Sequence, residues 1–137
     1  MSSVIDQAVQ ARLIATAPRS QVIPASLRYD RADPFAVHLV FPPAASLDGA
    51  EVTWTFGRDL LEEGLSEPAG AGDVQIWPYD SDDVVVEFHA VSGMAVVQFD
   101  VHELRAFLTR SYQLVAKGDE AGHLDVEADL VALLREA

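Results

Sequence analysis

The sequence contains no cysteine, and this absence excludes several kinds of site. Disulfide bonds, thiolate-bound metals and cysteine nucleophiles all require a thiol. The chain also lacks an apolar run near the ~18–20 residues that a membrane-spanning helix needs. Its first residues do not show the basic segment followed by an apolar run that is typical of a secretory signal. We therefore expect a cytoplasmic protein without direct membrane insertion.

Basic residues are scarce, because 9 Lys and Arg stand against 22 Asp and Glu and give a formal net charge of −13. Four arginines lie within residues 1–31, so the rest of the chain is still more acidic. A protein that makes roughly 6–10 phosphate contacts would need most of these cations on one face. The charge balance therefore disfavours nucleic acid as a partner, and it predicts repulsion from anionic lipid.

The length of 137 residues suits a single domain covering residues 1–137, and a hydrophobic content of 50% allows a substantial core. The first half is dominated by segments that are typical of β-strands. These segments are residues 7–16, 21–29, 36–41 and 51–56. Turn-forming clusters of proline, glycine, aspartate and serine separate the last three of them, at residues 30–34 and 42–49.

Three further strands are predicted over residues 73–79, 84–91 and 94–99. The last two flank Ser92 and Gly93, which form a two-residue hairpin signal. Pro78 indicates that the first of the three is an edge strand or ends there, because proline cannot donate to a hydrogen-bonded ladder.

Helices are predicted in three places. Residues 58–63 form a short helix in which Asp59 and Glu62 fit a capping box, and Gly64 is expected to end it. A longer helix begins at a second capping box, Asp100 with Glu103. Its mainly apolar stripe consists of Leu104, Phe107, Leu108, Ser111, Tyr112 and Val115.

The longer helix is expected to end with Lys117 in its last turn, followed by Gly118. A polar link then leads to a final helix over about residues 125–136, with Asp125 as its N-cap. The sequence therefore predicts an α+β fold: antiparallel sheets of about seven strands, a short helix after the fourth strand and two C-terminal helices.

The motifs of common catalytic and binding sites are missing. Gly70 and Gly72 do not fit a dinucleotide loop, because Gln75 occupies the sixth position and the glycines lead into a strand. The four histidines show no zinc-binding spacing, residues 119–127 do not fit a calcium loop, and no nucleophile elbow is present. We expect no enzyme activity, no cofactor and no metal.

Three aromatic residues of the predicted strands, Trp54, Phe56 and Trp77, allow two interpretations. Exposed, they could stack on the bases of a single-stranded nucleic acid. Buried, they belong to the core, and this is the interpretation that we favour.

Several stretches resemble the SsgA-like proteins, the sporulation and cell-division regulators of mycelial actinobacteria. The matching stretches are LRYDRADPFAVHLVF (27–41), WTFGRDLLEEGL (54–65), PAGAGDVQIWP (68–78) and DVEADL (125–130). Gly57 stands where the pattern leads us to expect alanine. The resemblance covers nearly the full chain, and it depends on the combination and order of these stretches.

The resemblance implies a fold similar to the Whirly-type single-stranded nucleic-acid-binding proteins, and a homotrimer. It also implies a non-catalytic adaptor that recruits or positions the tubulin-like GTPase FtsZ at the division septum, with an SsgA-type protein as a further partner. The alternative is a single-stranded nucleic-acid-binding protein. The implied fold and four arginines, Arg12, Arg19, Arg28 and Arg31, suggest this alternative.

Four residues are candidates for protein interaction. Arg58, Glu62 and Glu63 are predicted to be exposed on the short helix, whose buried side is formed by Leu60, Leu61 and Leu65. Gly118 is predicted to hold a left-handed backbone angle at the corner between the helices. The alternative interpretation of these positions is a solvated helix face and a plain cap.

Overall fold

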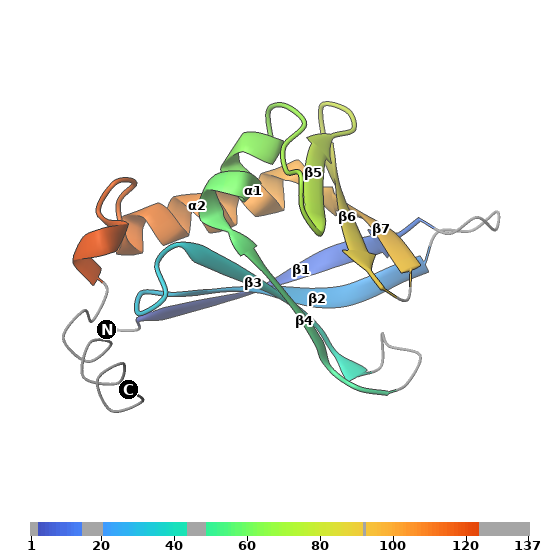
Figure 1. The fold of residues 1–137 in the computed structure, drawn as a ribbon, viewed down its shortest axis with the longest axis horizontal. Helices are drawn as coiled ribbons and strands as arrows, with labels where there is room; N and C mark the ends of the chain where they lie inside the picture. Colours follow the sequence, from blue (N-terminus) through green and yellow to red (C-terminus); the bar gives the residue numbers. More distant parts are fainter. Residues whose placement is uncertain (1–2, 15–20, 44–48, 92, 124–137) are drawn as a thin grey trace.

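The computed structural model describes residues 3–14, 21–43, 49–91 and 93–123. This part of the chain forms one antiparallel sheet with the strand order β4-β3-β2-β1-β7-β6-β5 (Figure 1). The strands are β1 Val4–Leu13, β2 Gln21–Asp30, β3 Ala36–Phe41, β4 Val52–Gly57, β5 Val74–Pro78, β6 Asp83–Ala90 and β7 Gly93–Asp100. The prediction of seven antiparallel strands is confirmed, whereas the likeness to the Whirly-type fold stays a prediction.

The two long strands β1 and β2 form the centre of the sheet. They pair along their whole lengths, from Val4 opposite Asp30 to Leu13 opposite Gln21. On its other side β1 pairs with β7 only over Ala11–Leu13. Because this second pairing is short, the first half of β1 is left beside a helix instead of a strand.

That helix is α2, Val101–Leu114, which follows β7 directly and runs along the sheet (Figure 1). Its predicted apolar stripe is confirmed, since Leu104, Phe107, Leu108 and Ser111 are buried and Tyr112 is partly buried against the core. Alternate residues of β1 face the same core, among them Ile5, Val9 and Ala11. Burial of one face of the strand and one stripe of the helix therefore holds the two elements together.

The short helix α1, Arg58–Gly64, follows β4 as predicted, but the prediction of a capping box at its start is wrong. The N-cap is Gly57, which has no side chain, and Glu62 makes contacts elsewhere. The helix does end at Gly64, yet this glycine is not among those with a positive φ. It is needed for close packing, because a Cβ at this position would overlap the side chain of Ile76 on β5.

The start and the end of α2 also differ in part from the prediction. Asp100 caps the helix by accepting a hydrogen bond from the backbone N–H of His102 at 2.7 Å. Glu103 does not reach back to complete the box; its Oε2 accepts from the backbone N–H of Gln10 at 3.2 Å. Since α2 ends at Leu114, Lys117 lies beyond the helix and not in its last turn.

After α2 the described chain forms a short 3-10 helix, η2, Glu120–His123, where the sequence indicated only a polar link. The helix predicted over about residues 125–136 lies outside the described residues. Pro78 closes β5, which is an edge strand as predicted. None of the described helices is long and apolar enough to span a membrane.

Candidate protein-interaction site

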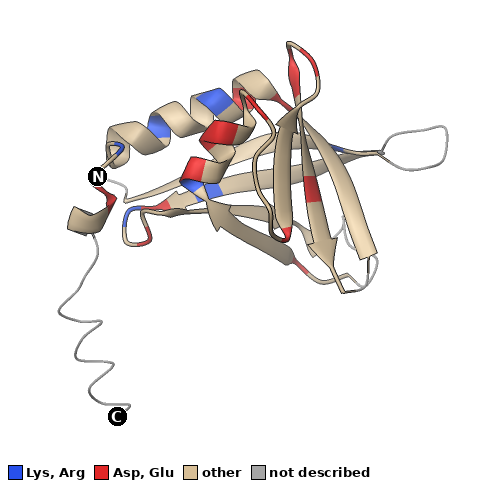
Figure 2. Ribbon diagram, turned by 45° about the horizontal axis from the view of Figure 1, so that its top comes forward, with Lys and Arg blue, Asp and Glu red and all other residues tan. Residues whose placement is uncertain are grey.

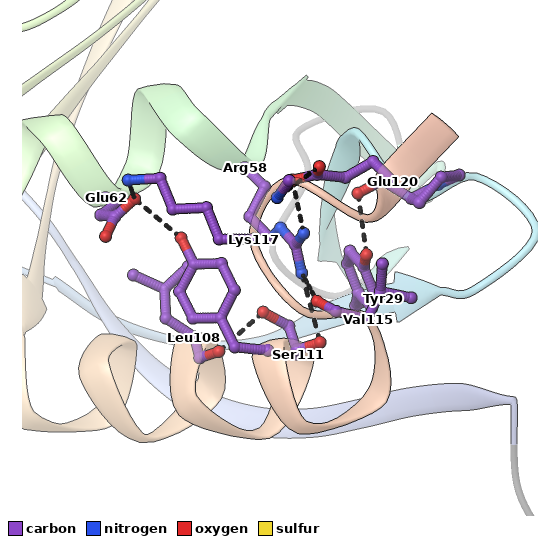
Figure 3. Close-up of polar contacts among 11 residues, drawn as sticks. Tyr29, Arg58, Glu62, Leu108, Ser111, Val115, Lys117 and Glu120 are labelled. Carbon is purple, nitrogen blue, oxygen red and sulfur yellow. Dashed lines mark hydrogen bonds and ion pairs between the residues drawn. The ribbon is translucent and has the colours of Figure 1, made fainter. Parts of the chain in front are cut away.

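The side chain of Arg58 lies in the interior of the protein, so the prediction that it is exposed is wrong. Only 1% of this residue is exposed. Its backbone N–H donates to the carbonyl oxygen of Phe35 at 2.8 Å, which fixes the start of α1 to the residue just before β3. From this position the side chain points toward the end of α2 (Figure 3). The strand-to-helix junction therefore decides the direction of the side chain.

The guanidinium of Arg58 satisfies carbonyl groups at the C-terminal end of α2. Nη1 donates to the carbonyl oxygens of Val115 at 2.8 Å and of Ser111 at 3.2 Å (Figure 3). The last carbonyls of a helix have no partner within the helix and carry partial negative charge. A buried cation at this place therefore caps α2 and joins it to α1.

Two aromatic rings enclose the same guanidinium. Its central carbon lies 4.9 Å from the ring centroid of Tyr29 and 4.5 Å from that of Tyr112. Both rings lie within the distance at which a cation is attracted to an aromatic face. Burial raises the pKa of both tyrosine hydroxyls, so both remain neutral beside the cation. Tyr29 also donates to the carbonyl oxygen of Pro34 at 2.8 Å.

Glu120 neutralises the buried cation. Its Oε1 lies 2.8 Å from Arg58 Nη2, and its Oε2 accepts from the backbone N–H of Gly118 at 2.9 Å. The hydrogen bond from Arg58 is the main reason that the pKa of Glu120 is lowered. Gly118 has a φ of +95°, which confirms the predicted left-handed angle. After this turn, Glu120 at the start of η2 reaches Arg58 at the start of α1.

A second, more exposed layer joins α1 to α2 through Glu62. Its Oε2 accepts from the hydroxyl of Tyr112 at 2.9 Å and lies 2.9 Å from Lys117 Nζ (Figure 3). The hydrogen bonds from Lys117 and Tyr112 lower the pKa of Glu62. The Glu62 side chain remains 39% exposed and that of Lys117 64%, so this ion pair contributes little to stability.

The structure thus places three of the four candidate residues in one corner and separates their roles. Arg58 is an internal clamp, Glu62 is half-buried in the contact between the helices, and Gly118 forms the turn. Glu63 is exposed on α1 as predicted.

The sequence did not identify four residues around Arg58 as members of this site: Tyr29, Ser111, Tyr112 and Glu120. The only signal for them was the place of Ser111 and Tyr112 on the apolar stripe of α2.

A groove of about 300 Å³ lies beside this corner, between α1 and α2. Glu62 and Leu65 line it from α1 and from the residue that follows α1, and Arg105 and Tyr112 line it from α2. Figure 2 shows acidic residues on α1 next to basic residues on α2. The corner therefore offers a surface with charges of both signs around a partly apolar floor.

The remaining sequence candidates have structural roles in the described chain. Gly70 has a φ of +98° and precedes β5, in agreement with a turn. Phe56 is buried, and the partly buried Trp54 packs on Phe88 with 4.9 Å between ring centroids, which agrees with the core interpretation for these two residues. Trp77 is only partly buried, on the edge strand β5, and does not belong to the core cluster. Within the described residues no group of three or more His, Asp or Glu could hold a metal ion.

The four arginines near the N-terminus do not form one described patch. Arg28 pairs with Asp6 at 3.1 Å, so its charge is partly compensated. Arg12 and Arg31 are exposed, and Arg19 lies outside the described residues.

Comparison with known proteins assigns the family. Residues 23–120 match the family model described as Streptomyces sporulation and cell division protein, SsgA. A sporulation-specific cell division protein SsgB of Salinispora tropica is 44% identical over 92% of this chain and 91% of its own length. The SsgB of Streptomyces coelicolor is 36% identical over the whole of both chains.

Solved structures agree with this assignment. A structure described as "Mutations in SsgB correlate to longitudinal cell division during sporulation of Streptomyces coelicolor" superposes with a TM-score of 0.81 at 36% identity, over 88% of this chain and 95% of the other. An SsgA-like sporulation-specific cell division protein of Thermobifida fusca gives 0.82 at 31% identity, over 96% and 98%. The chain belongs to the SsgA family of sporulation and cell division proteins.

Proposed function

We propose that this protein is a non-catalytic adaptor of sporulation-specific cell division, which recruits or positions FtsZ at sites of septation. The observation that carries the proposal is the 44% identity to a sporulation-specific cell division protein over 91% of that protein's length. On this proposal the protein acts in the cytoplasm at the division septum, as a homotrimer, with an SsgA-type protein as a further partner.

The corner formed by α1, α2 and the turn at Gly118 is the surface that we propose for partner binding. The buried Arg58 holds the three segments in one arrangement, because it contacts α2 and Glu120 from the start of α1. A rigid support of this kind reduces the ordering that a partner has to impose when it binds. Glu63 projects from α1 into solvent next to this support and is available to a partner.

Pelleting with polymerised FtsZ tests the proposal. The protein is expected to sediment with the polymer and to remain in solution without it. Glu63→Lys should reduce sedimentation, whereas Asp73→Lys, which makes the same charge change at an exposed site before β5, should not. A folded trimer, verified by its mass in solution, that does not sediment above background would count against direct recruitment.

A further inference from the structure

The outer edge of β4 is the feature on which this inference rests. In the described sheet β4 is the last strand on its side, with β3 as its neighbour (Figure 1). Its sequence, VTWTFG, contains neither proline nor a charged residue. Edge strands of this composition can pair with another chain, because nothing in them blocks the hydrogen-bonding groups.

The register shows which backbone groups of β4 face outward. The N–H of Arg58 donates to the carbonyl oxygen of Phe35, next to the pair Ala36 and Gly57. Hydrogen-bonded and non-hydrogen-bonded pairs alternate along an antiparallel ladder. The N–H and C=O groups of Thr53 and Thr55 therefore point away from β3, toward the free edge.

The opposite edge of the sheet, at β5, is protected in two ways. Ala69 forms two backbone hydrogen bonds with Ile76, at 2.8 and 3.0 Å, along the outer side of the strand. Pro78 then closes the strand with a residue that lacks an N–H. The two edges of this sheet are thus different, and among the described residues nothing pairs with the outer side of β4.

An apolar cleft of about 210 Å³ adjoins the β4 edge on the inner face of the sheet. Val52 and Trp54 line it from β4, and Phe41 and Phe88 are among the residues opposite them. All of its lining residues are apolar. The volume is below the ~300–1,000 Å³ of a typical small-molecule pocket, which favours a few side chains as its occupant.

A strand that pairs with β4 would bind the outward backbone groups of β4 and also place side chains in the apolar cleft. Side chains of a strand alternate between the two faces of a sheet. Every second side chain of the added strand would therefore lie on the same face as Val52 and Trp54 and reach the cleft. The remaining side chains would lie beside Thr53 and Thr55, which are exposed on the outer face.

Charge indicates the chemistry of the partner segment. The exposed acids Glu51 and Asp59 lie just before and just after β4, and the only cation from residue 50 to residue 59 is the buried Arg58. The whole chain carries a formal charge of −13. A second copy of this chain would bring the same acids to the same edge, whereas a segment with basic ends would be attracted.

We propose that the β4 edge binds an extended segment of a partner protein, with apolar residues at alternating positions and Lys or Arg at its ends. The segment adds a strand to the sheet and places its apolar side chains in the cleft. This inference deepens the proposed adaptor function and rests on it, because it gives the kind of segment that a partner contributes.

Binding of a synthetic peptide tests the inference. The peptide alternates valine with threonine and has lysine at both ends, and binding is measured by calorimetry and by amide hydrogen exchange in NMR spectra. The amides of Thr53 and Thr55 should exchange rapidly in the free protein and more slowly in the complex. The amide of Trp54, which already faces β3, should change little.

Variants at one position separate backbone pairing from side-chain contacts. Thr53→Pro removes an outward N–H without disturbing the ladder to β3, and it should weaken binding at least about fivefold. Thr53→Val keeps the N–H and should bind as the unmodified protein does. Ala95→Phe, which fills the cleft from β7, should also weaken binding. A peptide with glutamate ends should bind less tightly than the one with lysine ends.

Three results would overturn the inference. One is the absence of peptide binding, and another is binding that Thr53→Pro leaves unchanged. The third is protection of the Thr53 and Thr55 amides in the free protein, lost together with self-association in Thr53→Pro, which would assign the edge to a second copy. If Thr53→Pro does not fold, the exchange measurement on the unmodified protein still decides. The experiment contains no FtsZ, so its failure can be told apart from failure of the pelleting test.

Discussion

Arg58 has the contacts of a structural residue although it begins a helix at the surface of the protein. It combines an ion pair with Glu120, hydrogen bonds to two carbonyl oxygens and contact with two tyrosine rings. Buried ion pairs are not necessarily stabilising relative to an apolar core, because both charges must be desolvated. Removal of one member is costly, however, because the other charge is left in the interior without its partner.

Replacement of Arg58 by methionine should therefore destabilise the protein strongly. The side chain has similar length and no charge, so it leaves Glu120 and the end of α2 without the guanidinium. We expect the free energy of unfolding to fall by about 3–5 kcal/mol in urea denaturation. Glu63→Gln, at an exposed position of α1, is the control and should change it by less than about 0.5 kcal/mol. A loss for Arg58→Met as small as that of the control would contradict the clamp.

The carboxylates of Glu62 and Glu120 predict how stability depends on pH. Both have a pKa below the ordinary 4.5, Glu62 through hydrogen bonds from Lys117 and Tyr112 and Glu120 through that from Arg58. The folded protein therefore binds fewer protons than the unfolded chain near these pKa values. Their contribution is complete above 4.5 and is lost as the pH falls through the lower pKa of the folded state.

Urea denaturation between pH 6 and pH 3 measures this effect. The free energy of unfolding should decrease on acidification, and the decrease should be smaller in Glu62→Gln, which has no carboxylate to protonate at this site. An equal decrease in both proteins would show that Glu62 does not contribute to the loss.

At the scale of elements, local signals in the sequence predicted most of what is seen. Strand alternation, the pairing of β6 with β7 and the Asp100 cap depend on neighbouring residues, and they are confirmed. Gly93 is not part of the turn between these strands, because it already belongs to β7 and lies opposite Ala90. The capping box of α1 is wrong, because Glu62 finds partners from other segments, Tyr112 and Lys117. A local motif fails where tertiary contacts offer the same side chain a competing hydrogen bond.

The turn at Gly118 gives a prediction at this scale. A Cβ at Gly118 would meet no atom within 4 Å, so substitution by leucine costs only the backbone strain of its φ of +95°, about 1 kcal/mol. The same substitution would move the N–H that holds Glu120 and change the direction of η2. Gly118→Leu should therefore clearly reduce sedimentation with FtsZ, whereas its melting temperature should fall only slightly.

Gly122→Leu is the matched control for this experiment. A Cβ at Gly122 also meets no atom within 4 Å, but this glycine is not among those with a positive φ. The Gly122→Leu variant should sediment with FtsZ as the unmodified protein does. A large fall in the melting temperature of Gly118→Leu, with sedimentation unchanged, would assign Gly118 a role in stability alone.

For the whole molecule, the acidic charge determines which classes of partner are favoured. With 9 basic against 22 acidic residues, and with Arg28 paired to Asp6, little positive charge is available for a phosphate backbone. The same charge favours partner segments with basic residues, as proposed for the β4 edge.

A gel shift with single-stranded oligo-dT at low salt tests the consequence of this charge. We expect no tight complex, because a strand of phosphates would be repelled by most of the surface. The FtsZ pelleting assay on the same preparation provides the positive control for folded protein. Tight binding that weakens steeply with added salt would instead favour the single-stranded nucleic-acid-binding function.

The sequence by itself determined the α+β class, the stripe of α2 and the left-handed turn at Gly118, since these follow from neighbouring residues and from periodicity. It also located the strands, although the first was predicted over residues 7–16 and is observed at Val4–Leu13. Only the tertiary structure decided that Arg58 is buried, because its partners Ser111, Val115 and Glu120 lie 53 to 62 residues away along the chain. It also decided that β4 is an edge strand of the described sheet and lies beside an apolar cleft. Strand order and the curvature that brings Trp54 onto Phe88 are set by packing between distant segments, which no local pattern records.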